Sequence, residues 1–366
     1  MPLRPAPLPP LSRRAILLAL AAGGGGLPRA VLALPTRALE FPRDHGAHPD
    51  LRTEWWYVTG HARAGVAPSS REFGFQVTFF RSRVDVAQGL SSAFAARQLV
   101  FAHAALTDVQ GRRLWHDQRI AREGFGIAQA ARDDTRLALR DWTLARSADG
   151  AYQARIPAGE FSLDLRFMPT QPVLLQGQQG LSRKGPEARQ ASYYYSQPQL
   201  QASGRLQVQE QAFQVTGRAW LDHEWSEALL HPQAVGWDWI GMNLEDGSAL
   251  TAFRLRRADG SALWDGGSWR GPRGPVRAFE AGRTVFTPQR HWRSARSGAR
   301  YPVQWQVDCP AGRYFVRPLV DDQELDSRTS TGAIYWEGLS ELANARGETV
   351  GRGYLEMTGY AQPLKL

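Results

Sequence analysis

The 366-residue chain lacks most features that would lock it covalently or anchor it in a membrane. Cys309 is its single cysteine, so no intrachain disulfide can form and the fold must be held by its core. The apolar stretch at residues 15–22 is too short to span a bilayer as a helix, which needs about 20 apolar residues. We therefore expect a protein that does not span the membrane.

The chain also lacks the common catalytic signatures. It contains no G-x-S-x-G nucleophile elbow, no phosphate-binding P-loop, no dinucleotide-binding glycine fingerprint and no HExxH zinc motif. These absences disfavour a standard hydrolase and a nucleotide-dependent enzyme.

Positive charge exceeds negative charge, with 44 Lys and Arg against 35 Asp and Glu. Four of these arginines, and no acidic residue, lie in the first 33 residues, so the formal charge falls from +9 for the whole chain to +5 for the remainder. No Lys/Arg-rich run with interleaved aromatic residues follows. Nucleic acid is therefore not a predicted partner.

The first 33 residues have the organisation of an export signal. Arg13 and Arg14 precede the short apolar stretch, a glycine run and the small-residue sequence that ends at Ala33. Paired arginines before a weakly hydrophobic segment indicate the twin-arginine route, with an ordinary Sec signal as the alternative. We expect residues 1–33 to be a signal peptide and the mature protein to be periplasmic or secreted.

Short runs of alternating apolar and polar residues dominate the chain after Glu54. Phe73, Phe75, Val77 and Phe79, for example, fall on one face of a strand, which is typical of an antiparallel sandwich or barrel. Only residues 90–97 and 226–230 are candidate short helices. Further strands are predicted at residues 54–60, 99–107, 136–145, 151–156, 161–167, 212–225, 237–244, 248–256, 301–307, 333–339 and 353–360.

Two domains are expected, because the roughly 330 residues after the signal exceed what one core usually serves. Residues 226–235 are the best linker candidate, which divides the chain into units at residues 34–226 and 227–366. Residues 176–190 are rich in Gly, Gln, Arg and Lys and are predicted to be a mobile surface loop.

The most unusual segment is Trp-Leu-Asp-His-Glu-Trp at residues 220–225. On a strand, His223 and Trp225 share one face, whereas Asp222 and Glu224 point to the other. An imidazole beside a ring in a barrel interior could relay a proton. The alternative is that His223 is a buried core residue with a satisfied hydrogen bond and that Trp225 fills the core.

Glu54 is a second candidate, because a carboxylate among aromatic residues would have a raised pKa and could act as a general acid. The alternative is a structural ion pair with Arg52 or another basic residue. Aromatic residues at strand positions are predicted to bind substrate, with core and interface packing as the alternative reading; they are Trp56, Tyr57, Tyr194, Trp237 and Trp239.

A loop with two histidines and two aspartates could hold a metal ion. Asp44, His45, His48 and Asp50 lie within seven residues, but the loop lacks a third well-spaced partner. We predict neither a metal nor another cofactor, and a metal-dependent hydrolase at this loop is the weakest functional alternative.

Several segments together resemble the AttH/CrtC family, and they extend over essentially the whole chain after residue 33. They are FPRDHGAHP (residues 41–49), RTEWWYVTG (52–60), GFQVTFFR (74–81), LDHEWS (221–226), GWDW (236–239) and GYLEMTGY (353–360). The resemblance implies an all-β fold of two tandem lipocalin-like antiparallel β-barrels. It also implies the activity of carotenoid 1,2-hydratase, which adds water to a terminal isoprenoid double bond without a cofactor.

The hydratases of this family join a His-x-Trp pair to a Tyr-x-Asp pair a little further along the chain. His223 and Trp225 match the first pair, whereas residues 248–254, where the second is expected, contain neither Tyr nor Asp. The carboxyls available to protonate an alkene are therefore Asp222, Asp238 and Glu54.

The resemblance and the residues together predict a protein that binds a hydrophobic isoprenoid or lipid. His223, Trp225, Asp222 and Glu54 are the predicted catalytic residues of a cofactor-free hydratase. Because family members are associated with ABC-transporter genes, a non-catalytic lipid carrier or transporter accessory is the competing function. A secreted hydrolase is the weaker alternative.

Overall fold

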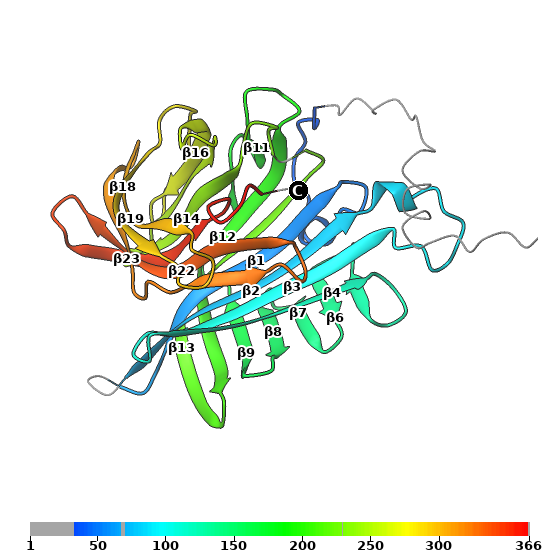
Figure 1. Cartoon of the computed structure of the whole chain (residues 1–366), viewed down its shortest axis with the longest axis horizontal. Coiled ribbons are helices and arrows are strands. Elements are labelled where there is room, and N and C mark those ends of the chain that lie inside the picture. The colour runs from blue at the N-terminus through cyan, green and yellow to red at the C-terminus, as the bar shows by residue number, and fades with distance from the viewer. Residues whose placement is uncertain (1–32, 67–69, 229, 365–366) are drawn as a thin grey trace, which may run out of the picture. The chain divides into compact units, whose positions relative to one another are not determined.

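The computed structural model describes residues 33–66, 70–228 and 230–364, and β-strands dominate them (Figure 1). Two short 3-10 helices, η1 (Arg43–His45) and η2 (Asp85–Ala87), are the helices in these ranges. No helix within them is long and apolar enough to cross a membrane. The predicted signal peptide lies outside the described residues, apart from Ala33.

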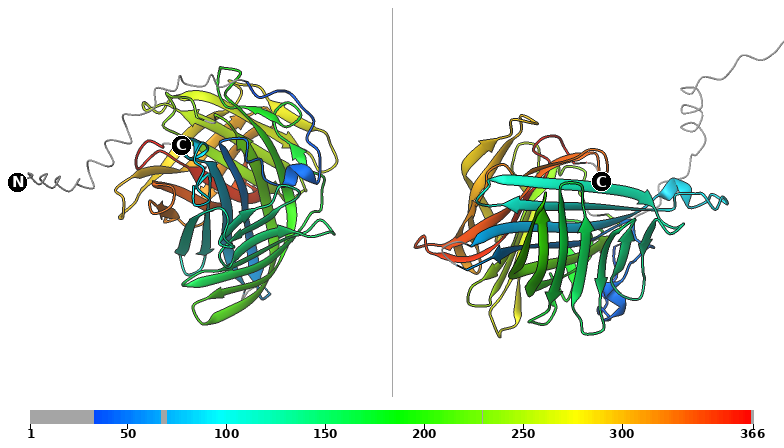
Figure 2. Two further views of the ribbon diagram at one scale, coloured as in Figure 1. Left: turned by 90° about the vertical axis from the view of Figure 1, so that its right-hand side faces the viewer. Right: turned by 90° about the horizontal axis from the view of Figure 1, so that it is seen from below.

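The first sheet contains thirteen antiparallel strands in the order β4-β3-β2-β1-β13-β12-β9-β8-β7-β6-β5, with β10 and β11 paired to β12. β3 and β4 also approach β5 and β6, so the sheet curls into a nearly closed barrel (Figure 2). Its strands are β1 (Thr53–Ala64), β2 (Arg71–Arg83), β3 (Gln98–Asp108), β4 (Arg113–Arg122), β5 (Ala128–Ala130), β6 (Arg136–Leu139), β7 (Trp142–Arg146), β8 (Tyr152–Pro157), β9 (Phe161–Met168), β10 (Leu174–Leu175), β11 (Leu181–Arg183), β12 (Ala191–Val208) and β13 (Gln211–Ser226).

The second sheet contains ten antiparallel strands in the order β17-β16-β15-β14-β23-β22-β20-β19-β18, with β21 paired to β22. The all-β, antiparallel prediction is therefore confirmed. These strands are β14 (Gly236–Leu244), β15 (Ala249–Arg256), β16 (Ala262–Arg270), β17 (Val276–Phe279), β18 (Val285–Arg293), β19 (Arg300–Cys309), β20 (Gly312–Pro318), β21 (Glu324–Ser327), β22 (Ala333–Asn344) and β23 (Thr349–Met357).

Alternation along the strands places one face of each in the barrel core. Phe73, Phe75, Val77 and Phe79 of β2 are fully buried in the core of the first barrel, as the period-two pattern predicts. Burial of such side chains contributes about 1.5–3 kcal/mol each, so these rings are a main source of the barrel's stability.

Three local predictions were wrong. Residues 136–145 form two strands, because Arg140 takes a positive φ of 58° and turns the chain between β6 and β7. Residues 90–97 are turns without a helix, and β13 stays extended through Ser226, where a helix was predicted to begin.

Residues 176–190 are more ordered than a mobile loop, which corrects a fourth prediction. Residues 181–183 pair with β12 as strand β11, and Gln176, Ser182, Lys184 and Gln190 are all buried. The polar side chains that suggested solvent exposure are instead hydrogen-bonded or ion-paired inside the structure.

The two sheets pack against each other through an apolar cluster that includes Tyr57, Trp220, Trp239 and Leu339. Gly74 of β2 allows the sheets to approach closely at this point. A Cβ atom on Gly74 would lie 2.8 Å from the Tyr354 hydroxyl oxygen and 2.9 Å from the Leu339 Cβ, so no side chain fits there.

Candidate active site

β13 divides the residues of the unusual segment between two environments. Its register with β1 and β12 places His223 between Trp56 and Tyr195, inside the first barrel, where His223 and Trp225 are both 0% exposed. Asp222 and Glu224 point the opposite way, toward the second sheet. The segment therefore contributes to two separate clusters, one in the barrel and one between the sheets.

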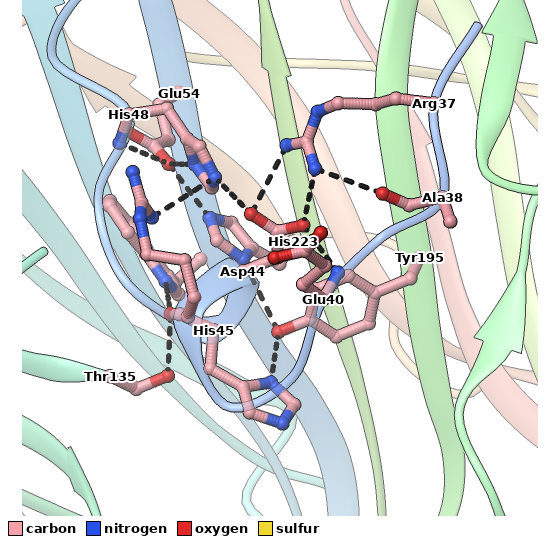
Figure 3. Close-up of polar contacts among 12 residues, drawn as sticks. Arg37, Ala38, Glu40, Asp44, His45, His48, Glu54, Thr135, Tyr195 and His223 are labelled. Atoms are coloured by element: carbon pink, nitrogen blue, oxygen red, sulfur yellow. Dashed lines mark hydrogen bonds and ion pairs between the residues drawn. The ribbon is translucent and has the colours of Figure 1, made fainter. Parts of the chain in front are cut away.

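The cluster in the barrel is centred on the Glu54 carboxylate (Figure 3). Glu54 Oε1 lies 2.7 Å from His48 Nδ1 and 2.9 Å from His223 Nε2, and Glu54 Oε2 accepts a hydrogen bond of 2.8 Å from Arg81 Nε. The backbone N–H of His48 donates to the same carboxylate at 2.8 Å. These four contacts, two from His48 and one each from His223 and Arg81, compensate for the burial of the Glu54 carboxylate.

The predicted raised pKa of Glu54 is therefore wrong. Burial disfavours its charged form, but hydrogen bonds from His223 and His48 and the positive charge of Arg81 outweigh burial and lower the pKa below its ordinary value. Glu54 forms the structural ion pair that was the alternative prediction. Its partner is Arg81, whereas Arg52 is exposed.

The remaining ring nitrogens of this cluster also have partners. His223 Nδ1 lies 3.2 Å from the Tyr195 hydroxyl, which is 2.7 Å from His45 Nδ1. Burial lowers the pKa of His223 to about 4, so its imidazole is neutral at pH 7. His48 Nε2 lies 2.9 Å from Asp44, and its ring stacks on Trp225. These contacts describe a packed, hydrogen-bonded polar core.

The same three side chains could in principle hold a metal ion. His48, Glu54 and His223 each offer a ligand atom, and these atoms lie within 4.8 Å of one another. The loop supplies His48, and the further ligand atoms come from Glu54 on β1 and His223 on β13. However, Arg81 already places a buried positive charge on the Glu54 carboxylate, which opposes a second cation there. We infer no metal at this position.

We expect His223→Ala to act on stability and not on ligand binding. The variant leaves the buried Glu54 charge without one of its donors, which should lower the free energy of unfolding by about 1–3 kcal/mol. Urea unfolding measures the loss, and His291→Ala on an exposed position of β18 is the matched control. A ligand affinity lowered at unchanged stability would contradict this assignment.

The second cluster lines a cavity of about 330 Å³ between the two sheets. Its walls come from β1, β2, β3, β4, β12 and β13 of the first sheet and from β14, β15, β22 and β23 of the second. Five predicted site residues have a place in this wall: Asp222, Tyr57, Tyr194, Trp237 and Trp239. Trp56, His223 and Trp225 are not part of it, and Glu54 borders it with its carboxylate turned into the barrel.

Two acidic residues of the cavity were missed by the sequence analysis. Glu337 on β22 and Glu356 on β23 lie directly opposite each other in the strand register, and both face the cavity. The available signal was an acid between apolar neighbours on a predicted strand, as in Trp336-Glu337-Gly338 and Leu355-Glu356-Met357. Without the register, nothing in the sequence joins these positions to Asp222.

Asp222 is a carboxyl whose two protonation states are balanced near neutral pH. Burial raises its pKa to about 7, against the effect of hydrogen bonds from Ser196, Tyr194 and Trp220, which favour the carboxylate. The donor distances are 2.5 Å from Ser196 Oγ, 2.7 Å from the Tyr194 hydroxyl and 2.7 Å from Trp220 Nε1. These donors also fix the orientation of the carboxyl in the cavity.

Burial also raises the pKa values of the opposed pair on the second sheet. Burial raises the pKa of Glu356 to about 7, although Trp237 Nε1 donates to its Oε2 at 2.9 Å. Burial and the neighbouring Glu356 raise the pKa of Glu337 well above its ordinary value. Near neutral pH, Glu356 and Asp222 can each gain or lose a proton.

The other nearby acids are held in ion pairs. Glu224 lies 2.9 Å from the Lys184 ammonium group and accepts a hydrogen bond from Ser192. Asp238, one of the carboxyls considered from sequence, is 0% exposed in its side chain and accepts a hydrogen bond of 2.7 Å from Arg254. Asp238 is not part of the cavity wall.

Comparisons with known proteins agree with the fold and the sequence segments. A family model described as AttH-like matches residues 32–360. The crystal structure of a protein described as AttH from Nitrosomonas europaea is 48% identical, covers 90% of this chain and 99% of its own, and superposes with a TM-score of 0.83. A search of curated proteins finds no match.

Two further solved structures share the fold at low sequence identity. Kievitone hydratase from Nectria haematococca is 14% identical over 91% of this chain and 94% of its own, with a TM-score of 0.66. The structure of CghA with Sch210972 is 12% identical over 86% of this chain and 89% of its own, with a TM-score of 0.50. The resemblance and the lipocalin-like barrel fold predicted from sequence are thus confirmed.

Proposed function

Because the chain belongs to the AttH-like family, we propose that it binds a hydrophobic isoprenoid or lipid in the cavity between its sheets and adds water to a carbon–carbon double bond of that ligand. Asp222 and Glu356 are the residues proposed to exchange the proton. The proposal moves the predicted chemistry from the barrel interior, where His223 and Trp225 lie, to the opposite face of β13.

The observation that carries the proposal is the pair of carboxyls with pKa values of about 7 in a largely apolar cavity. A proton donor or acceptor works best when its pKa lies near the operating pH. A cavity that only stored a lipid would gain nothing from buried acids, because each one costs desolvation free energy. Both acids contact the cavity directly.

In the proposed reaction, the Glu356 carboxyl transfers its proton to one alkene carbon, and the π electron pair forms the new C–H bond. The adjacent carbon becomes a cation, which a water molecule captures through its oxygen. The Asp222 carboxylate takes the proton that this water releases, and the product is an alcohol. Proton return from Asp222 to Glu356 through solvent completes a net addition of water without a cofactor.

Aromatic rings around the acids can stabilise the cation. Tyr57 meets Trp239 edge to face with ring centroids 5.4 Å apart, and Trp237 donates its indole N–H to Glu356. The negative face of such rings attracts a cation, a contribution of about 0.5–2 kcal/mol. A Cβ on Gly241 would collide with the Trp239 ring, so this glycine allows the indole its position in the wall.

Titration of the purified protein with a C20 prenyl alcohol should quench its tryptophan fluorescence in a saturable way. Trp237 and Trp239 line the cavity, so a ligand there changes their surroundings. Thr78→Phe, which fills the cavity from β2, should abolish the saturable phase, whereas Thr287→Phe on an exposed position of β18 should not. No saturable change with any apolar ligand would count against a binding cavity.

Export by the twin-arginine route to the periplasm is also proposed, and it rests on the sequence of residues 1–33. Changing Arg13 and Arg14 to Lys should leave the precursor in the cytoplasm, as cell fractionation and immunoblotting would show. Changing Arg4 and Arg29 to Lys is the control with the same charge. Normal export of the double variant, or export in a strain without the Tat translocon, would overturn the proposal.

A role beside an ABC transporter is the second function that the family resemblance suggests. The cavity supports it as far as ligand binding is concerned, because a lipid carrier needs an apolar site of this kind. Binding without turnover would favour this carrier function over hydration.

A further inference from the structure

Three polar atoms at the inner end of the cavity are buried without a hydrogen-bond partner. They are the Tyr57 hydroxyl, Gln76 Oε1 and Glu337 Oε1. All three residues line the cavity, and they are only 6%, 1% and 2% exposed. A buried polar group left unpaired costs about 1–3 kcal/mol, so a ligand group that pairs with these atoms gains affinity.

The other polar atoms nearby are paired, and this fixes which atoms face the cavity. Gln76 Nε2 donates to Glu337 Oε2 at 2.8 Å and to the Thr78 hydroxyl at 3.0 Å, so the Gln76 carbonyl oxygen is left free. Burial and then the facing Glu337 carboxyl raise the pKa of Tyr57, but the Tyr57 hydroxyl makes no hydrogen bond of normal geometry to it. We call Tyr57, Gln76 and Glu337 the polar recess.

The cavity changes from polar to apolar between the recess and its mouth. Along β2, Gln76, Thr78 and Phe80 face the cavity in that order, and Phe80 is less buried than the two residues before it. Leu99 and Ile120 line the outer part, where Ile120 is 40% exposed. A ligand that matches this wall has a polar group at its inner end and an apolar chain toward the mouth.

The recess favours one kind of polar group. Gln76 Oε1 can only accept a hydrogen bond, whereas the Tyr57 hydroxyl can donate one. A hydroxyl can donate to the first and accept from the second at the same time. An ether or carbonyl oxygen has no proton to donate, so it would leave Gln76 Oε1 unpaired.

Charge in the cavity argues against an anionic group. The described lysine and arginine that line it, Lys184 and Arg81, are each paired with a carboxylate. Burial lowers the pKa of the lining His103 to about 3, so this imidazole is neutral. No cation is therefore available to balance a carboxylate or a phosphate, while Asp222 and Glu356 would repel one.

We propose that the cavity is selective for an isoprenoid alcohol, bound with its hydroxyl in the recess formed by Tyr57, Gln76 and Glu337 and its hydrocarbon chain toward the mouth. This inference rests on the proposed function, because it names the class of ligand for the same cavity. It assigns Glu337 to the bound hydroxyl and leaves the proton exchange to Glu356, its partner in the strand register, and to Asp222.

The test compares four ligands with the same C20 prenyl skeleton: the alcohol, its methyl ether, the hydrocarbon and the carboxylate. Their dissociation constants are measured with the full chain by tryptophan fluorescence. We expect the alcohol to bind about tenfold more tightly than the other three, which corresponds to the net effect of one or two hydrogen bonds. Equal affinity of the alcohol and the hydrocarbon, or tighter binding of the carboxylate, would overturn the inference.

Tyr57→Phe removes one hydroxyl from the recess without changing the ring. It should bring the affinity for the alcohol to within about threefold of that for the hydrocarbon, while the hydrocarbon still binds as to wild type and so reports an intact cavity. Tyr314→Phe, away from the cavity on β20, is the matched control and should keep the full preference. An unchanged preference in Tyr57→Phe would contradict the assignment.

The outcomes also separate this inference from the proposed function. Saturable binding of all four ligands with equal affinity overturns the preference for an alcohol and leaves the proposed cavity intact. Absence of saturable binding by every ligand overturns both.

Discussion

Replacing Arg81 with methionine is expected to lower the free energy of unfolding by about 3–5 kcal/mol. The Arg81 side chain is 1% exposed and its partner Glu54 is 0% exposed, so the variant leaves an uncompensated negative charge in the barrel core. Arg81 also donates to the backbone carbonyls of His48 and Leu51, at 2.9 Å and 2.8 Å, and these contacts are lost as well.

Urea unfolding followed by far-ultraviolet circular dichroism measures this effect. Arg346→Met is the control, because Arg346 pairs with Glu348 on the surface with 78% of its side chain exposed, and such pairs contribute only about 0–1 kcal/mol. Adding Glu54→Gln to Arg81→Met should recover part of the loss, since the buried charge is then removed. A loss below about 1 kcal/mol for Arg81→Met would contradict the buried ion pair.

Asp222→Asn and Glu356→Gln are each expected to lower the rate of hydration by about 10²–10⁴-fold, the usual contribution of a general acid or base. Both amides keep the shape of the carboxyl, so ligand affinity should change only a few-fold. Single-turnover conversion of the bound alkene, followed by mass spectrometry of the alcohol, measures the rate. Glu348→Gln on the surface is the matched control.

The same assignment predicts the pH dependence of the reaction. Glu356 must be protonated to act as the acid, so activity falls as the pH rises above its pKa of about 7. Asp222 must be ionised to act as the base, so activity also falls as the pH drops below its pKa of about 7. A narrow optimum near neutral pH is expected. A ligand bound by wild type but never converted at any pH would instead favour the carrier function.

The sequence predicts which side chains share one face of a strand, but it does not predict what packs against that face. Alternation correctly separates His223 and Trp225 from Asp222 and Glu224. Which of these faces borders a cavity depends on where the second sheet packs, and no local pattern in residues 220–225 carries that information. The cavity side was therefore assigned to His223, while the structure opens it on the side of Asp222.

The chemistry of Glu54 shows a similar limit. Its aromatic neighbours in sequence suggested a raised pKa, because burial alone favours the neutral acid. Its actual partners come from a loop, from β2 and from β13, at His48, Arg81 and His223. Since these contacts are set by strand register and barrel closure, the sign of the pKa shift could not be read from the local sequence.

The close approach of the sheets at Gly74 has a mechanical consequence for the site. Asp222 belongs to the first sheet and Glu356 to the second. The distance between the proton acceptor and the proton donor therefore depends on the distance between the two packed sheets. Gly74 allows this close approach because it has no side chain, whereas a Cβ there would collide with Leu339 and Tyr354. A Gly74→Ala substitution would therefore move the two sheets apart and lengthen the distance between Asp222 and Glu356, although neither residue is changed.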